Sequence, residues 1–318
     1  MILAGLIAAR FTHYTALVLL FGTASFIRFA RLGGADGAAG EDETASRRLR
    51  STLLWSSLAA LAAAAGVLAF TAANMAGELR GMVDAATLRT ILVDTDFGRI
   101  WSLRLALAAA LAAWLVAARR REPSPAADWI VLLLAGALLA TVALTGHAQI
   151  RTGLAGALHR TADAAHLVAA AVWLGALAGF LVLLAPSRSG GPENALGAGQ
   201  RLQRFHSVGT VAVAALLVSG LVNSWFLVGG FGPLVSTTYG RLLLAKLALF
   251  GAMVALAADN RLRLVPRLNA DLARGLPAEA WAARLRSHIR LEFGFGLAVL
   301  ATVSVLGAIA PAIDAEPL

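Results

Sequence analysis

The sequence contains no cysteine and few charged residues. The absence of cysteine excludes disulfides, thiolate zinc sites and a thiol nucleophile. Only 14% of the 318 residues are charged, whereas soluble domains have about 25%. Hydrophobic residues make up 59% of the chain, and the mean hydropathy is +0.75. This composition excludes a soluble globular enzyme, a disordered chain and a nucleic-acid-binding domain, and it predicts a protein embedded in the lipid bilayer.

Long apolar stretches recur along the whole chain. A helix of about 20 apolar residues spans a bilayer, and the run 107–115 lacks the alternation of polar and apolar residues that a barrel strand needs. We therefore predict an all-α polytopic membrane protein with eight transmembrane helices. Their approximate ranges are 5–30, 51–74, 99–118, 127–146, 160–185, 203–228, 241–264 and 288–310.

The loops between these helices differ in charge. Alternate loops carry 17 basic residues on one side of the membrane and five on the other. Because basic loops stay in the cytoplasm, both termini are expected outside. We interpret the basic net charge of +9 in this way rather than as a nucleic-acid-binding feature. In one of the outer loops, segment 82–93 is expected to form either an amphipathic surface helix or a plain loop.

One sequence pattern occurs twice. Thr95–Arg99 and Thr237–Arg241 share the pattern T-x-[FY]-G-R, and each is followed five residues later by a second base, Arg104 or Lys246, and then by Leu-Ala-Leu. Chance similarity between Ala/Leu-rich helices does not explain so specific a match.

The first and fifth predicted helices also match in spacing. His13 precedes Gly22 by nine residues, and His166 precedes Gly175 by nine residues. We therefore expect two similar four-helix halves, 1–150 and 151–318. Since four spans per half is an even number, a pseudo-two-fold axis along the membrane normal should relate them, as in parallel-repeat transporters.

Candidate metal ligands lie at the predicted outer ends of the helices. His159, Asp163 and His166 are spaced four and three residues apart, so they share one helical face. Imidazole and carboxylate groups suit Cu(II) and zinc. The alternative is a polar cap at the helix end, which fits His159, near the surface, better than His166, which is about 10 Å deeper at 1.5 Å per residue.

Other helices add candidates on the same side. His13 is expected at the depth of His166, His147 ends the fourth helix, and Met75 ends the second. A thioether is a ligand for Cu(I), although ordinary packing is the competing interpretation for Met75. The supporting charges Arg104 and Lys246 are expected to pair with an acid. The acids proposed for this pairing are Asp163 and Glu78.

A second group of polar residues lies near the predicted inner surface. His288 and Glu292 are four residues apart on the last helix and share a face, and His206 begins the sixth helix. These three could form an inner exit site, and interface capping explains them equally well. Asp259 is expected to pair with Arg263 at i+4.

The second half contains several short motifs with a familiar order. They are His166-Leu-Val-Ala-Ala-Ala-Val-Trp173-Leu-Gly175, Arg204-Phe-His206, Ser219-Gly220, Thr238-Tyr239-Gly240-Arg241 with Lys246, Asn260-Arg261 and Pro266. Together they resemble the copper resistance protein D (CopD) family of bacterial inner-membrane proteins, over the whole eight-span plan and most specifically at about 200–270. The resemblance implies inward copper movement and a separate periplasmic copper-binding partner of the CopC type.

Two functions compete at this point. In the first, the chain is a copper permease, a transporter rather than an enzyme, whose outer site passes copper between the halves toward His206 and His288. In the second, it is a membrane redox protein in which His13 and His166 are the axial ligands of one b-type heme. No Walker motif or nucleophile elbow is present, so ATP-driven transport within this chain is not expected.

Overall fold

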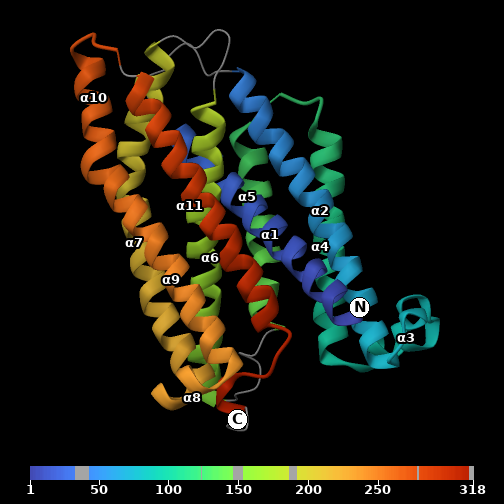
Figure 1. The fold of residues 1–318 in the computed structure, drawn as a ribbon. Helices are drawn as coiled ribbons and strands as arrows, with labels where there is room; N and C mark the ends of the chain where they lie inside the picture. Colours follow the sequence, from blue (N-terminus) through green and yellow to red (C-terminus); the bar gives the residue numbers. More distant parts are fainter. Residues whose placement is uncertain (33–42, 123, 146–152, 186–191, 278, 315–318) are drawn as a thin grey trace.

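The computed structural model describes residues 1–32, 43–122, 124–145, 153–185, 192–277 and 279–314. Over these residues the chain is helical, without strands, and eight helices are long and apolar enough to cross a membrane (Figure 1). This confirms the all-α prediction and its count of candidate spans. The helices are α1 (Ile2–Leu32), α2 (Glu43–Ala76), α4 (Asp96–Ala118), α5 (Pro125–Ala143), α6 (Gly153–Leu183), α7 (Pro192–Val228), α9 (Thr238–Asp259) and α11 (Glu279–Leu306).

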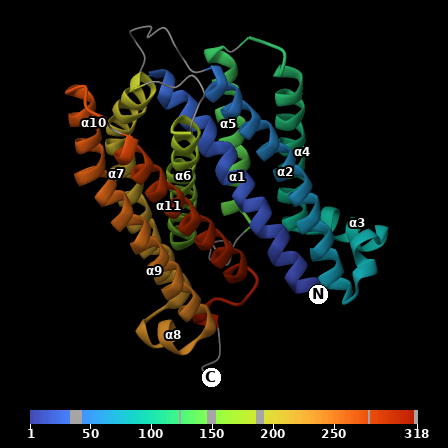
Figure 2. The same cartoon turned by 45° about the horizontal axis from the view of Figure 1, so that its top comes forward.

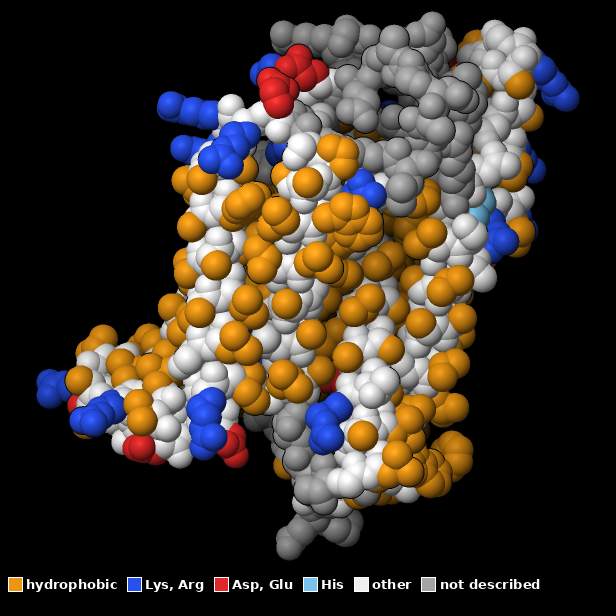
Figure 3. Space-filling view, turned by 180° about the vertical axis from the view of Figure 1, so that it is seen from behind, with side chains coloured by type: hydrophobic (Ala, Val, Ile, Leu, Met, Phe, Trp, Pro, Cys, Tyr) orange, Lys and Arg blue, Asp and Glu red, His pale blue; other side chains and the backbone are white. Residues whose placement is uncertain are grey.

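The surface of the bundle matches a lipid environment. On the face shown in Figure 3, hydrophobic side chains fill a broad band, and Lys, Arg, Asp and Glu gather at the two ends. Large apolar side chains within the candidate spans are exposed, among them Leu133 at 67% and Leu221 at 75%. In water such a surface would be strongly unfavourable, whereas in lipid it is the expected solvent-facing surface. Both termini lie at the same end of the bundle (Figures 1 and 2).

Two short helices lie at the end of the bundle that holds the termini (Figure 1). The first, α3 (Ala85–Asp94), covers most of segment 82–93, for which the sequence allowed either a helix or a loop. The structure shows the helix. Asp84 caps it, and the Thr87 hydroxyl and backbone N–H both donate to the Asp84 carboxylate, which lowers the pKa of that carboxyl. The second is α8 (Phe231–Ser236).

The two segments that share the repeated sequence pattern also share a local structure. Thr95 caps α4 by accepting a hydrogen bond from Gly98 N at 2.9 Å, and Thr237 caps α9 by accepting one from Gly240 N at 3.0 Å. Each of these glycines lies directly against the backbone of the short helix before it, so a Cβ would collide there. The pattern therefore specifies a tight turn from a surface helix into a spanning helix.

Helix α1 lies at the centre of the bundle and packs against α2, α5, α6 and α11. It meets α6 at Gly22 and Gly175, where the backbones touch and neither residue has room for a Cβ. Phe26 and Phe180 pack edge to face nearby, with ring centroids 5.0 Å apart. Small residues at a crossing point are how membrane helices reach such contact.

A π-helical turn, Asn260–Leu264, joins α9 to α10 (Val265–Ala273). Leu264, Val265 and Leu268 are buried there, each at 1% exposure or less. A π turn rotates the following helix relative to the preceding one and often lies at a functional position. Here it places Asn260 toward the bundle interior, with 7% of its surface exposed.

Candidate functional site

His13 is fully buried in α1. Its Nδ1 lies 3.1 Å from the carbonyl oxygen of Ala60 in α2. Because a carbonyl only accepts, Nδ1 must carry the proton, and in the neutral ring Nε2 therefore holds a lone pair. That nitrogen is buried and has no hydrogen-bond partner among the described residues. A neutral imidazole with an unused Nε2 is a form in which histidine binds metals.

Arg104 of α4 lies beside His13 and is 1% exposed. Its Nε donates to Thr141 Oγ1 at 2.8 Å, and its Nη2 donates to the Thr141 carbonyl and to Thr145 Oγ1. The guanidinium stacks 4.2 Å above the ring of Trp101. The described residues contain no ion pair of Arg104, so oxygens of Thr141 in α5 and of Thr145 just after it take the place of the expected acid partner.

His166 of α6 has a comparable arrangement in the second half. Its Nδ1 lies 3.0 Å from Ser219 Oγ in α7, and the same hydroxyl donates to the Ala215 carbonyl. Since the hydroxyl proton is used on Ala215, Nδ1 of His166 donates and its Nε2 holds the lone pair. Gly220 lies against the imidazole ring. Both histidines are therefore oriented by an oxygen on the next spanning helix, as metal-binding histidines commonly are.

Asp163 lies one turn before His166 and belongs to the same polar group. Asn223 Nδ2 is 3.5 Å from Asp163 Oδ1. Lys246 of α9 interacts electrostatically with both Asp163 and His166. Lys246 is thus placed near one of the two acids that were expected to accompany it, while Glu78 is exposed.

Of the remaining outer candidates, His159 and Met75 belong to the described residues. His159 is buried and stacks on Phe226, with ring centroids 4.8 Å apart. Met75 is 59% exposed. His147 lies outside the described residues. In the described part of the chain, no three His, Asp or Glu side chains come close enough to hold a metal together.

The inner candidates divide between two sets of partners. His288 Nδ1 lies 3.6 Å from Asp259 Oδ2, and Arg263 pairs with the same carboxylate at 3.2 Å, as predicted for Asp259. Glu292 lies one turn further along α11 and is 1% exposed. His206 is half-buried in α7, and its carbonyl accepts from Thr210 at 2.7 Å.

Glu292 is held by two residues that the sequence analysis names among the family motifs but not as site candidates. Trp173 Nε1 donates to Glu292 Oε1 at 2.7 Å, and Asn260 Nδ2 lies 3.4 Å from Oε2. The seven-residue spacing of His166 and Trp173 places both on one face of α6, and this was the available signal for Trp173. The π turn that directs Asn260 inward has no comparable sequence signal.

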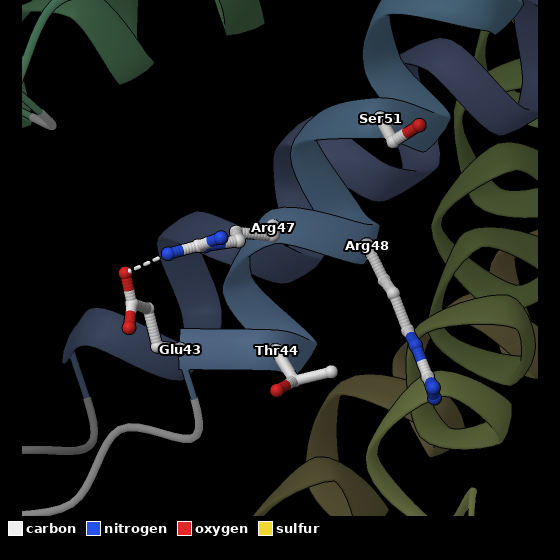
Figure 4. Close-up of a pocket in the computed structure, with 5 residues that line it drawn as sticks. All are labelled: Glu43, Thr44, Arg47, Arg48 and Ser51. Carbon is white, nitrogen blue, oxygen red and sulfur yellow. Dashed lines mark hydrogen bonds and ion pairs between the residues drawn. The ribbon is translucent and has the colours of Figure 1, made fainter.

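Neither of two pockets in the described residues is lined by a histidine. One of about 480 Å³ is lined by the start of α2, where Arg47 pairs with Glu43 at 2.5 Å (Figure 4). Both of these side chains are mostly exposed. A second, of about 320 Å³, is lined by Asp259, Arg263, Leu264, Arg267 and Arg284. The first pocket is a solvated surface at the end opposite the termini (Figure 1).

The fold and these buried groups define a polytopic α-helical membrane protein with oriented histidines inside its spans. Comparison with known families narrows this class. Residues 1–157 match the family described as "Copper resistance protein D-like, N-terminal domain", and residues 199–306 match "Copper resistance protein D". The chain belongs to the copper resistance protein D family, as its motifs indicated.

Relatives of known name cover almost the whole chain. It is 35% identical to copper resistance protein D of Pseudomonas syringae pv. tomato, over 97% of each chain. It is 31% identical to the inner membrane protein YebZ of Escherichia coli, over 96% of this chain and 98% of YebZ. It is 32% identical to the copper transport protein CutJ of Bacillus subtilis, over 95% of this chain but 52% of CutJ. No solved structure matches.

Proposed function

We propose that this protein carries copper across the bacterial inner membrane from the periplasm to the cytoplasm. The observation that supports this most strongly is the state of its two deep histidines. His13 and His166 each use Nδ1 on an oxygen of the neighbouring helix, which leaves Nε2 as a lone-pair donor inside a candidate membrane span. Ionisable groups at such depth are costly, so a functional role is the default interpretation.

The absence of a preformed cluster of three ligands among the described residues fits transport better than storage. A transporter must bind its ion tightly enough to accept it and weakly enough to release it. In this proposal His13, His166 and Asp163 accept copper at the outer ends of α1 and α6, together with His159, His147 and Met75 nearer the surface. His206, His288 and Glu292 lie on the exit side.

We also propose that the two halves arose by duplication. Equivalent threonine caps at Thr95 and Thr237, and the contact between the equivalent glycines Gly22 and Gly175, support this. A residue that touches its own counterpart lies on the axis that relates two repeats. The proposed boundary is between residues 150 and 151, and the axis runs along the membrane normal.

The positive-inside distribution supports the proposed orientation, with both termini and the short helices α3 and α8 in the periplasm. The copper transport protein CutJ is about twice as long as the region that it shares with this chain. In our proposal a separate periplasmic protein of the CopC type delivers copper to this chain.

The metal content of the purified chain separates copper transport from the heme alternative. Protein grown with added copper should contain copper and no stoichiometric iron. His166→Ala should lower copper binding, whereas Thr161→Ala, an exposed position on the same helix, should not. About one iron per chain with a heme absorbance spectrum would overturn the copper proposal and favour two axial histidines.

A further inference from the structure

The geometry points to a copper route that runs through the second half of the protein, past Glu292, rather than between the two halves. This inference rests on the proposed transport function and adds to it a cation site made of Glu292 and Asn260. It also assigns unequal roles to the two halves, although their helices follow the same plan.

The surface between the halves is closed at its centre. Gly22 of α1 and Gly175 of α6 touch through their backbones, and the ring of Phe26 fills the space beside Gly179. Leu17 and Leu20 of α1 are buried at 1% exposure or less. A metal ion that followed this contact would meet the apolar side chains of Leu17, Leu20 and Phe26 and backbone groups already bonded within helices, so the loss of its hydration would have little compensation.

The buried charges differ in sign between the halves. Arg104 in the first half and Glu292 in the second are each 1% exposed. At the spacing that aligns His13 with His166, Asp163 corresponds to Arg10. Arg104 lies beside His13, whereas both Asp163 and Lys246 accompany His166. The carboxylates of Asp163 and Glu292 therefore favour a cation along the second half, even though Lys246 lies beside His166 there.

Glu292 has the features of a cation site. Its carboxylate accepts from Trp173 and Asn260, and none of the ion pairs of the described residues includes it. Asn260 is 7% exposed, and its Oδ1 is buried without a hydrogen-bond partner. An unpaired carboxylate beside an unused amide oxygen is an arrangement that a metal cation would complete, and oxygen ligands favour Cu(II) over Cu(I).

The second half has polar groups on either side of this site. Asp163 and His166 precede Trp173 on α6, and ten residues of helix, from Asp163 to Trp173, cover about 15 Å. Beyond Glu292, His288 lies one turn away on α11 and contacts Asp259. A cation that leaves His166 would thus reach the Glu292 carboxylate in the interior and then the Asp259 carboxylate near the inner end.

The test is uptake of Cu(II) into liposomes that contain the full-length protein, with copper binding measured on the same preparations. Glu292→Gln keeps the shape and can still accept from Trp173, but it removes the charge. We expect it to slow uptake about 10- to 100-fold with copper binding retained, and Glu292→Asp to restore part of the rate. Thr23→Val, a buried isosteric change in the first half, is the matched control and should transport normally.

The results separate this inference from the proposed function. Wild-type protein that takes up no copper would overturn transport itself. If wild-type protein takes up copper and Glu292→Gln does so at the same rate, only the route through the second half is overturned. A greater loss of uptake for His13→Ala than for His166→Ala would overturn that route as well. Size-exclusion profiles and thermal stability of each variant show that it is folded, and Glu292→Asp keeps the inference testable if Glu292→Gln does not fold.

Discussion

Gly22 of α1 and Gly175 of α6 touch through their backbones, and they are the residues that the His13 and His166 spacing places in equivalent positions. Because no Cβ fits at either position, the contact sets how closely α1 and α6 approach. Dispersion contacts along such a crossing hold membrane helices together where the hydrophobic effect does not.

A side chain at this crossing should weaken the fold. We expect Gly22→Ala to destabilise the protein by about 1–3 kcal/mol, the usual range for overpacking. Gly251→Ala is the control, because a Cβ there meets no atom within 4 Å. Unfolding in a mixed-detergent titration measures both. Equal stabilities of the two variants would contradict the close contact.

The paired caps predict paired effects. Thr95→Ala and Thr237→Ala should each cost about 1 kcal/mol, because each removes the hydroxyl that accepts from a helix N-terminal N–H. Thr71→Ala should cost less, since its hydroxyl only donates to a carbonyl of its own helix. Detergent unfolding of the three variants tests this, and a large difference between the two caps would count against equivalent structures in the two halves.

Arg104 should not tolerate lysine. The guanidinium bonds two oxygens of Thr141 and one of Thr145 while it stacks on Trp101, and an ammonium group cannot reproduce that geometry. We expect Arg104→Lys to lower stability by about 1–3 kcal/mol. Arg99→Lys, at an exposed residue paired with Asp96, should behave as wild type in the same unfolding assay. A wild-type stability for Arg104→Lys would refute the proposed role of these bonds.

Ser219 should act on copper through His166. Its hydroxyl accepts from Nδ1 and so leaves Nε2 free, and loss of such an orienting partner commonly lowers metal affinity 10- to 100-fold. We expect about this loss for Ser219→Ala in a competition assay with a copper chelator. Ser224→Ala should bind normally, because Ser224 donates to a carbonyl within its own helix. If the two variants bind copper equally, Ser219 does not position His166.

The absence of cysteine makes the orientation easy to test. Single cysteines at Val83 and at Leu276, both well exposed, report the two ends of the bundle. In intact spheroplasts, an impermeant maleimide should label Val83→Cys and spare Leu276→Cys, because the proposed orientation places the basic loops in the cytoplasm. The opposite labelling would place both termini inside.

The sequence was sufficient to predict the eight spans, since hydropathy directly reflects the requirement that backbone groups be satisfied within lipid. It also indicated that Asp259 pairs with Arg263, because helical spacing alone brings them together. It did not predict the partners of Arg104 or Glu292. Those depend on which faces of α5, α6 and α9 meet, and the π turn at Asn260 changes the helix phase in a way that periodicity does not show.

The central claim is that copper moves inward through this chain, and uptake by oriented liposomes tests it most directly. The protein should be inserted so that the end of the bundle that carries α3 and α8 faces outward. Cu(II) added outside should then appear inside faster than in liposomes without protein. Asp163→Asn together with His166→Ala should abolish the difference, whereas Thr161→Ala should retain it. Equal copper entry with and without protein, or undiminished entry in the double variant, would contradict the account.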